Sequence, residues 1–302
     1  MLVGCSGGPD SLALAAAAAF EAPRLGLRAG AITVDHGLQD GSPDRALAIA
    51  AKLERLGLDP VLTVSVEVAK PGAAPDYPGP EAAARHARYA AFQSALAETG
   101  AGAILLGHTM DDQAETVLLG LARGSGTRSI AGMAPSAGSY LRPFLALRRQ
   151  QTIDACAALE LSPWHDPQNL DQAFRRTRVR ERILPLMEEL IGPGVTEALA
   201  RTASQSRADA DLLDALTDEH ADRLLGAGPL AVGDLAGLPG AIRTRLLRRA
   251  SVAAGAEAGA LSAVHVAAID SLITDWHGQR GVDLPGGVRC ERRYGRLHFT
   301  DG

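Results

Sequence analysis

The start of the chain restricts its possible folds more than any other stretch. An apolar run, MLVGC, is interrupted by two glycines and resumes as an apolar, helix-forming tract that reaches Ala19. This pattern predicts a strand, a tight loop over Ser6–Ser11 (SGGPDS) and a helix. Backbone N–H groups at a helix N-terminus lack partners within the helix and carry partial positive charge. We therefore expect the loop to bind phosphate or pyrophosphate.

The residue types in this loop suit an anion site. Gly7 and Gly8 allow a ligand to approach the backbone closely, and Pro9 suits a first helical turn because its missing N–H is no loss there. The loop is not a Walker A motif, since GxxxxGK[ST] is absent and the only lysines are Lys52 and Lys70. It also lacks the GxGxxG fingerprint of dinucleotide-binding domains. The alternative is a glycine-rich turn that only connects a strand to a helix.

The length and composition are those of a globular protein with a large core. The chain has 302 residues, enough for two domains, of which 46% are hydrophobic and 22% charged. No stretch has the pattern of a transmembrane helix or a signal peptide. Cys5, Cys156 and Cys290 form no CxxC motif, so neither a zinc site nor an iron–sulfur site is indicated. We expect a cytoplasmic location.

Strands and helices alternate after the first unit. We expect strands at Arg28–Gly37, Pro60–Val68 and Ala101–His108, helices at Asp44–Leu58 and Glu81–Gly100, and a Pro/Gly-rich loop at Lys70–Pro80. This alternation predicts an α/β fold with a doubly wound parallel sheet. Such sheets bind ligands beyond the C-terminal ends of their strands, where Asp35, His36 and His108 lie. For His36 alone, a capping or core role is the better interpretation.

A second group of polar residues, HTMDDQAETVLLGLARGSG, begins at His108. Thr109 can cap a helix, and with Asp112 three residues later the pair is close to a capping box. Asp111 and Asp112 precede Glu115 by four and three residues, so all three acids are neighbours on one helix face. A single acid in a first helical turn often serves only the helix dipole. Three acids next to a histidine at a strand end exceed what capping requires.

A basic segment, AFRRTRVRER, stands out in a chain whose net charge is −5. On an α-helix, Arg175, Arg178 and Arg182 share one face. Arg176 and Arg180 form an adjacent row. A local basic stripe on an acidic protein can bind nucleic acid, whereas the alternative is an ordinary solvated surface.

Six segments together resemble one enzyme family. SGGPDSLAL, VDHGLQDGS, EAAARHARY, HTMDDQAETVLLGLARGSG, LRPFL and DPQNLDQAFRRTRVRERILPLM, in this order, resemble tRNA(Ile)-lysidine synthases of the PP-loop superfamily. SGGxDS alone identifies only the superfamily, whereas HxxDDQAET followed by RGSG is far more specific. The resemblance runs from about Leu2 to Met187 and continues weakly into DLPGGVRCERRYGRL near the end of the chain. The sequence departs from the family pattern at Gln39, at Thr177 and at its start, where relatives usually carry an upstream segment and a truncated start would explain the difference.

The resemblance implies two domains. Residues 1–191 would form the PP-loop ATP-pyrophosphatase domain, and residues 192–302 a connector helix with a second, smaller, mostly helical domain that binds substrate and tRNA. Within the second part we expect the connector at Val195–Leu225, helices at Ile242–Ala250 and near Ser262–His277, and a hairpin in VDLPGGVRCERRYGRLHF. We do not expect the further C-terminal domain of longer members.

The resemblance also implies a reaction that joins L-lysine to the wobble cytidine of a CAU anticodon. The cytidine 2-oxygen attacks the α-phosphate of ATP, and the lysine ε-amine then displaces AMP. Expected ATP-binding residues are Ser6, Gly7, Gly8, Pro9, Asp10, Ser11, Asp35, His36 and His108, and expected catalytic residues are Asp10, Ser11, Asp111 and Arg142. Asp10 would bind Mg²⁺, because its charge would otherwise repel the triphosphate. Arg142 is a candidate phosphate clamp.

The remaining expectations concern lysine and tRNA. Asp112 and Glu115 would hold the α-ammonium of lysine. Arginines would bind tRNA phosphates or stack on a splayed base; the candidates are Arg85, Arg88, Arg175, Arg176, Arg178 and Arg182. The expected cofactors are ATP and Mg²⁺, and the expected partners are L-lysine and tRNA(Ile) with a CAU anticodon. A homodimer is a possible assembly, and no membrane association is expected.

Two other functions fit part of the pattern. Another PP-loop enzyme, such as a tRNA thiolase, would use the same loop but would need sulfur-handling cysteines, and the three present are unsuitably spaced. A non-catalytic nucleotide sensor or tRNA-binding protein would not need to keep Asp10, Asp111, Asp112 and Glu115 together.

Overall fold

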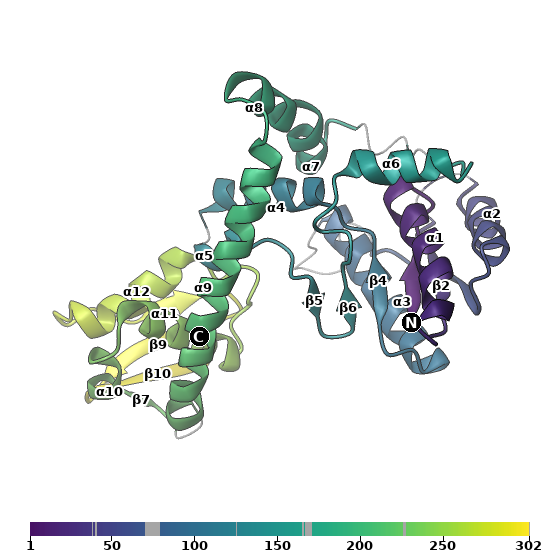
Figure 1. Ribbon diagram of the computed structural model, residues 1–302. Coiled ribbons are helices and arrows are strands. Elements are labelled where there is room, and N and C mark those ends of the chain that lie inside the picture. The colour runs from purple at the N-terminus through teal and green to yellow at the C-terminus, as the bar shows by residue number, and fades with distance from the viewer. Residues whose placement is uncertain are drawn as a thin grey trace. The chain divides into compact units, whose positions relative to one another are not determined.

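The computed structural model describes residues 1–37, 39, 41–69, 79–124, 126–164, 166, 171–225 and 228–301. The chain divides into two compact units (Figure 1). The first comprises Met1–Thr116 and Met133–Ala200, and the second comprises Val117–Gly132 and Arg201–Gly302. In the part of the chain described, no helix combines the length and the apolar character needed to span a membrane.

The first unit is built on a six-stranded sheet. Its strands are β1 (Leu2–Gly4), β2 (Gly30–Asp35), β3 (Val61–Ser65), β4 (Ile104–Leu106), β5 (Ser136–Ala137) and β6 (Tyr140–Leu141). They lie in the order β3-β2-β1-β4-β6-β5, and every neighbouring pair is parallel except β5 and β6. Leu2 at the centre lies opposite both Gly30 and Ile104. The sequence predicted this parallel sheet correctly, whereas the two-residue strands β5 and β6 were too short to predict.

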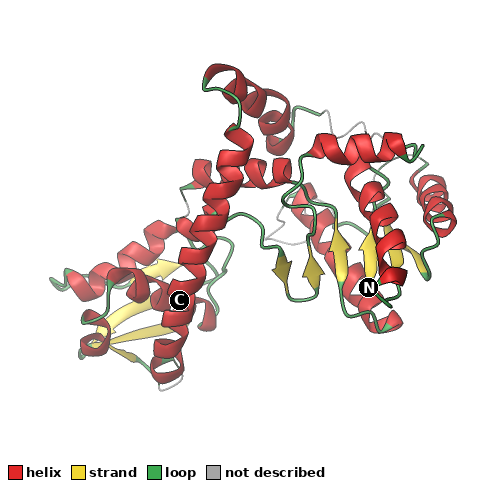
Figure 2. Cartoon of the chain, in the orientation of Figure 1, coloured by secondary structure: helices red, strands yellow, loops and turns green. Residues whose placement is uncertain are grey.

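Helices cover both faces of this sheet, as Figure 2 shows in red. In the part of the chain that the structure describes, the α-helices of both units are α1 (Pro9–Arg24), α2 (Ser42–Arg55), α3 (Pro80–Thr99), α4 (Met110–Arg123), α5 (Thr127–Ile130), α6 (Arg149–Ala158), α7 (Arg175–Arg178), α8 (Leu184–Leu190), α9 (Val195–Leu224), α10 (Val232–Ala236), α11 (Gly240–Ala253) and α12 (Ala263–Thr274). Side chains of adjacent strand residues point to opposite faces. Accordingly, Val3 packs in a core with α1, α2 and α6, while Leu2 packs in a second core with Phe92 of α3. Burial on both faces explains why the strands are continuous apolar runs.

The strand order reverses on the two sides of β1, since β2 lies on one side and β4 on the other. In open α/β sheets this switch point opens a crevice beyond the strand ends, where ligands bind. The C-terminal ends of β1, β2 and β4 lead directly into Ser6, His36 and His108. The fold therefore brings the predicted nucleotide residues to one edge of the sheet.

The second unit has its own sheet and core. Strands β7 (Leu230–Ala231), β8 (Val282–Leu284), β9 (Val288–Arg293) and β10 (Arg296–Asp301) form an antiparallel sheet in the order β7-β10-β9-β8. Its core includes Leu246 of α11, Ile269 of α12 and Leu297 of β10. The predicted hairpin is β9 and β10, to which β7 and β8 add an edge strand each.

The arginine-rich segment is not a regular α-helix. Helix α7 is followed by one π-helical stretch, Val179–Ile183, before α8 begins. A π-helix bonds residue i to i+5 and so turns less per residue than an α-helix. The interval from Arg178 to Arg182 therefore departs from α-helical geometry, and the side chains of Arg175, Arg178 and Arg182 are all exposed.

Candidate active site

The loop between β1 and α1 has the predicted conformation. Helix α1 begins at Pro9, with Gly8 as its N-cap. Gly7 has a φ of +83°, and a Cβ at this position would lie 2.7 Å from Cδ1 of Ile49. Its carbonyl accepts a 2.8 Å hydrogen bond from the backbone N–H of Trp164. Only glycine satisfies both the conformation and the space at this point of the loop.

Ser11 closes the loop onto itself. Its Oγ donates to the carbonyl of Gly8 at 3.1 Å and accepts from the backbone N–H of Ser6 at 3.2 Å. The side chain is buried. Ser11 therefore supports the shape of the loop in this structure, and a direct part in catalysis stays a prediction.

Two histidines and an aspartate stand at the neighbouring strand ends. Asp35 is buried and accepts the backbone N–H of Gly37 at 2.9 Å. The Nδ1 atoms of His36 and His108 are buried and have no hydrogen-bond partner among the residues that the structure describes. Burial, reinforced by Arg88, lowers the pKa of His36, and burial lowers the pKa of His108 to about 4. Both rings are thus neutral at neutral pH, each with one donor and one acceptor nitrogen.

Arg149, at the start of α6, links the loop to the acids of α4. Its Nε donates to Oδ2 of Asp10 at 3.1 Å. Another guanidinium nitrogen lies 2.8 Å from Oδ1 of Asp112, and the third lies 3.4 Å from Oε1 of Glu115. The backbone N–H of Arg149 also donates to Oδ2 of Asp111 at 2.7 Å. One arginine therefore holds four acids from two different helices.

Glu115 is the most enclosed of these acids. Its side chain is 0% exposed. Arg176 donates to Oε2 at 2.6 Å and Arg180 to Oε1 at 2.7 Å, in addition to the contact with Arg149. Arg176 also lies 3.3 Å from Asp112. A fully buried carboxylate needs such partners, because an unpaired buried charge is very unfavourable.

These contacts form a cluster of four acids and four arginines. We call it the acid–arginine cluster; its members are Asp10, Asp111, Asp112, Glu115, Arg148, Arg149, Arg176 and Arg180. Burial by itself would raise the pKa of Asp112, but Arg149 and Arg176 and the hydrogen bond from Thr109 lower it to about 2. Thr109 and Asp112 form the predicted capping box, with the N–H and Oγ1 of Thr109 at 2.8 and 2.9 Å from Oδ2.

Asp10 is less strongly compensated than Asp112. Burial raises the pKa of its carboxyl, and Arg149 and Thr152 oppose this effect. One carboxylate oxygen accepts from Arg149 and the other from the hydroxyl of Thr152. A carboxylate offers about four lone-pair sites, so Asp10 can still bind a cation. Among the described residues no group of three or more His, Cys, Asp or Glu side chains could hold a metal ion, so a Mg²⁺ ion here would need phosphate oxygens as further ligands.

The sequence assigned Arg176 to tRNA, but here it faces inward. Arg176 and Arg180, which we call the inner arginine pair, contact Glu115. The outer arginine row, comprising Arg175, Arg178 and Arg182, is exposed. The two rows that the sequence distinguished therefore occupy different environments, and only the outer row has the exposure that phosphate contacts require.

Arg142, Arg85 and Arg88 are the remaining arginines that the sequence assigned to the site. Arg142 is buried, and one of its guanidinium nitrogens donates to the carbonyl of Ala134 at 2.8 Å. Its buried Nε has no partner in the described part of the chain. Arg85 is exposed and lies 4.7 Å from the ring centre of Tyr89. Arg88 also lies over Tyr89, at 6.0 Å.

Sequence reasoning missed Arg149 and Arg148. Both follow the LRPFL segment, and 139 residues separate Arg149 from Asp10. The one local signal was a pair of arginines at the start of a helix, where cations are unfavourable for the helix dipole. That unfavourable position indicates that acids from elsewhere in the fold compensate their charge.

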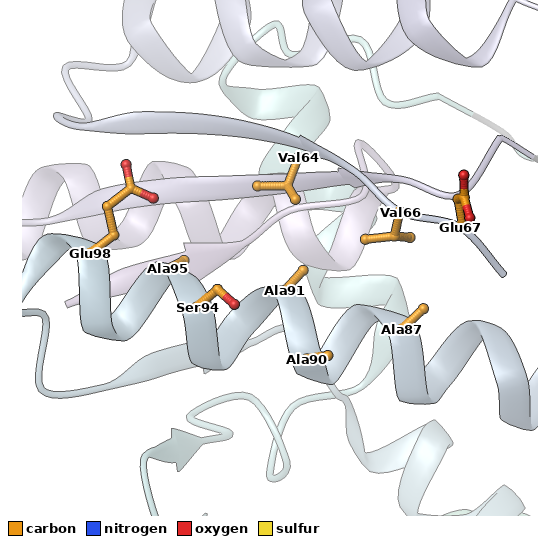
Figure 3. Close-up of a pocket in the computed structure, with 9 residues that line it drawn as sticks. All are labelled: Val64, Val66, Glu67, Ala87, Ala90, Ala91, Ser94, Ala95 and Glu98. Carbon is orange, nitrogen blue, oxygen red and sulfur yellow. The ribbon is translucent and has the colours of Figure 1, made fainter.

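Hollows lie both beside the acid–arginine cluster and away from it in the described part of the first unit. The smaller, of about 190 Å³, adjoins the acid–arginine cluster and is lined by Asp111, Glu115, Arg148, Arg149, Arg180, Leu184, Pro185, Glu188 and Thr196. The larger, of about 390 Å³, lies between β3 and α3 (Figure 3). Its walls are valine and alanine side chains, with Glu67 and Glu98 at opposite ends. It contains none of the predicted site residues, so the smaller, charged hollow is the better candidate for a polar substrate.

Comparison with known proteins identifies two regions of the chain. Residues 1–187 match a family model described as a PP-loop domain, and residues 230–298 match the TilS substrate binding domain. The tRNA(Ile)-lysidine synthase of Thermobifida fusca is 58% identical over 98% of this chain and 90% of its own length. The corresponding proteins of Streptomyces coelicolor and Leifsonia xyli are 54% and 53% identical, over 100% and 99% of this chain and 85% and 89% of theirs.

A solved structure shares the fold of the chain. It is the U34-tRNA thiolase NcsA from Methanococcus maripaludis with its 4Fe-4S cluster. The TM-score is 0.54 and the sequence identity 19%, over 68% of this chain and 71% of the thiolase. At this identity the similarity establishes the fold alone. The cysteines Cys5, Cys156 and Cys290 are all free and buried.

Proposed function

Because this chain belongs to the tRNA(Ile)-lysidine synthase family, a family of ligases, we propose that it joins L-lysine to the wobble cytidine of tRNA(Ile) with a CAU anticodon. The observation that carries the details is the position of Arg149 between Asp10 of the PP-loop and Asp112 and Glu115 of α4. A single guanidinium connects the proposed phosphate site to the proposed amino-acid site.

The first step in this proposal activates the cytidine. Its 2-oxygen attacks the α-phosphate of ATP, the bond between the α- and β-phosphates breaks, and pyrophosphate leaves as AMP becomes attached to the base. The N–H groups of the PP-loop at the start of α1 are suited to the pyrophosphate. The neutral His36 and His108, whose Nδ1 atoms have no hydrogen-bond partner among the described residues, are suited to polar groups of the nucleoside. Catalysis of this kind depends mainly on positioning and charge stabilisation.

Mg²⁺ is a proposed cofactor of this step. Asp10 would be its protein ligand, and nucleotide phosphates would supply further oxygens. When bound, the ion would neutralise charge on the departing pyrophosphate. The pairing of Asp10 with Arg149 means that the protein already supplies one positive charge at this carboxylate.

The second step transfers lysine. Its ε-amine attacks carbon 2 of the activated base, AMP leaves, and the nitrogen loses a proton. In the acid–arginine cluster, the carboxylates of Asp112 and Glu115 are already paired with arginines. The α-ammonium group of lysine can pair with an acid, and its α-carboxylate can pair with the arginine that this acid releases. One arginine–acid contact is thereby exchanged without leaving a charge unpaired. We propose this exchange at Asp112 and Glu115, with Arg180 beside the 190 Å³ hollow as the arginine that takes the carboxylate.

One experiment tests the proposed reaction directly. The protein is incubated with ATP, labelled lysine and a transcript of tRNA(Ile), and the nucleotide products are separated by chromatography. We expect lysine on the tRNA, together with AMP and pyrophosphate in equal amounts. The control transcript has uridine in place of the wobble cytidine and should accept no lysine. ADP as the main product, or equal labelling of both transcripts, would contradict the proposal.

A further inference from the structure

The turn between β9 and β10 has an unusual residue at its tip. Arg293 pairs with Arg296, so Tyr294 and Gly295 alone connect the strands. Both have positive φ, 51° for Tyr294 and 72° for Gly295. A two-residue hairpin turn with two positive φ values favours Asn, Asp or Gly at its first position, and for a bulky side chain this conformation is disfavoured. Tyrosine is therefore a costly choice at this position.

Packing does not explain the tyrosine. Its relative exposure is 102%, so the ring is fully open to solvent. The cost of its backbone conformation is thus not offset by any burial of its ring. A conformational outlier without a structural benefit is a reason to look for a ligand of the exposed group.

The turn is held firmly in place. The carbonyl of Gly295 accepts the backbone N–H of Val232 at 2.9 Å. Arg296 donates to the carbonyl of Pro229 at 3.0 Å. These bonds tie the tip to β7 and to the start of α10, beside which Figure 1 draws the hairpin. The exposed ring is therefore presented on a fixed support, which reduces the entropy lost when a partner binds.

Arginines flank Tyr294 in the sequence of the turn. Three arginines lie within the five residues Arg292–Arg296. Arg293 is 65% exposed and pairs with Glu291, and Arg296 is exposed as well. Arg292 lies 5.0 Å from the ring centre of the half-exposed Trp276. An exposed aromatic ring among arginines is the arrangement that binds unpaired nucleotides, by stacking on bases and pairing with phosphates.

We propose that the β9–β10 turn contacts tRNA, with Tyr294 stacked on an unpaired base and Arg293 and Arg296 at neighbouring phosphates. The inference rests on the proposed function for the identity of the RNA. It concerns the region that matches the substrate binding domain, and it adds an RNA contact distant in sequence from the acid–arginine cluster.

The test uses two substitutions of the same residue. Tyr294→Phe keeps the ring and should bind a tRNA(Ile) transcript like the parent protein. Tyr294→Asn removes the ring but suits the turn, so it should fold at least as well. We expect it to weaken tRNA binding by about five- to a hundredfold, the range for losing one base–aromatic stack. Filter binding measures the affinity, and thermal unfolding checks the fold.

Three results would overturn the inference. Tyr294→Asn could bind tRNA as tightly as the parent protein, or both variants could be weakened equally, which would implicate the hydroxyl instead of the ring. Alternatively, Tyr294→Asn could change the oligomeric state in size-exclusion chromatography. That result would show that this surface binds a second copy of the chain instead of tRNA. A parent protein that binds tRNA but attaches no lysine would contradict the proposed function without affecting this comparison.

The arginines have a separate readout. Changing Arg293 and Arg296 together to Gln should reduce the dependence of tRNA affinity on salt. Each phosphate that is no longer neutralised makes the negative slope of log K against log salt shallower by about 0.7 to 0.9. An unchanged slope would contradict the proposed pairing of these arginines with phosphates.

Discussion

Arg149 donates its Nε to Oδ2 of Asp10 at 3.1 Å, although 139 residues separate them in the sequence. The other nitrogens of the same guanidinium reach Asp112 and Glu115. The planar, forked guanidinium is suited to hold three carboxylates in fixed relative positions, which the point charge of lysine is not. Arg149 thereby determines the distance from the PP-loop to the acids of α4.

Replacing Arg149 tests this relationship. Arg149→Met should destabilise the protein by about 3–5 kcal/mol, because it leaves buried carboxylates with fewer partners. Adding Glu115→Gln to this variant should restore part of the loss, since one uncompensated charge is removed. Thermal unfolding of the single and double variants measures both effects. Equal stability of parent and Arg149→Met would show that the ion pairs of Arg149 contribute nothing.

Arg149→Lys separates positioning from charge. It keeps the positive charge but cannot contact three acids at once, so we expect stability close to that of the parent and slower lysine transfer. Steady-state kinetics with varied lysine should show a higher KM for lysine together with a lower kcat. Full activity of Arg149→Lys would mean that only the charge matters at this position.

Asp10→Asn tests the acid of the PP-loop. Because Arg149 keeps its contacts with Asp112 and Glu115 in this variant, the fold should remain intact. Turnover should fall by roughly ten- to a hundredfold, as expected when a charged partner is removed. AMP formation in the presence of tRNA measures turnover, and circular dichroism checks the fold. Normal AMP formation by this variant would exclude Asp10 from the phosphate site.

Glu115→Gln tests the proposed lysine site. We expect the KM for lysine to rise by roughly ten- to a hundredfold, since a charged hydrogen-bond partner contributes ~1.5–3 kcal/mol, while ATP binding changes much less. The matched control is Glu197→Gln, which removes a partly exposed acid paired with Arg148. Equal effects of the two variants on the KM for lysine would move the amino-acid site elsewhere.

The two arginine rows should respond differently to substitution. Changing Arg178 and Arg182 to Ala should weaken tRNA binding and change the stability of the protein little. The negative slope of log K against log salt should become shallower by about 0.7 for each single-strand phosphate that is no longer neutralised. Changing the inner arginine pair to Ala should instead lower stability by about 3–5 kcal/mol, because Glu115 remains buried. Filter binding across a salt series and thermal unfolding separate the outcomes. If the variant of Arg178 and Arg182 kept the tRNA affinity and the salt dependence of the parent protein, the tRNA-binding surface would lie elsewhere.

His108 should make stability sensitive to acid. Its pKa of about 4 lies below the unfolded value of 6.5, so between these values the unfolded chain binds more protons and stability falls as the pH drops. At about 1.4 kcal/mol per pKa unit, the full effect is roughly 3 kcal/mol. His108→Gln should be less sensitive to pH than the parent between pH 6.5 and 4, as measured by denaturant unfolding. Identical pH profiles would show that His108 is not protonated differently in the two states.

Much of the first unit was predictable because its signals are local. The SGGPDS loop with Pro9 at the helix start follows from backbone geometry within a few residues. The apolar strands follow from burial on both faces of the sheet. The capping box of Thr109 and Asp112 follows from a spacing of three residues.

The partners of the charged residues were decided by tertiary structure. The sequence placed Asp112 and Glu115 on one helix face but could not indicate that Arg149, Arg176 and Arg180 neutralise them. The inner pair reaches Glu115 across 61 and 65 residues, and these contacts depend on how separate helices pack. A buried charge selects its partner by proximity in space, whereas helical periodicity relates only residues within a turn or two of each other. The sequence by itself therefore determined the PP-loop and the family, and only the packing of α1, α4, α6, α7 and the π-helical stretch Val179–Ile183 decided which arginines face the acids.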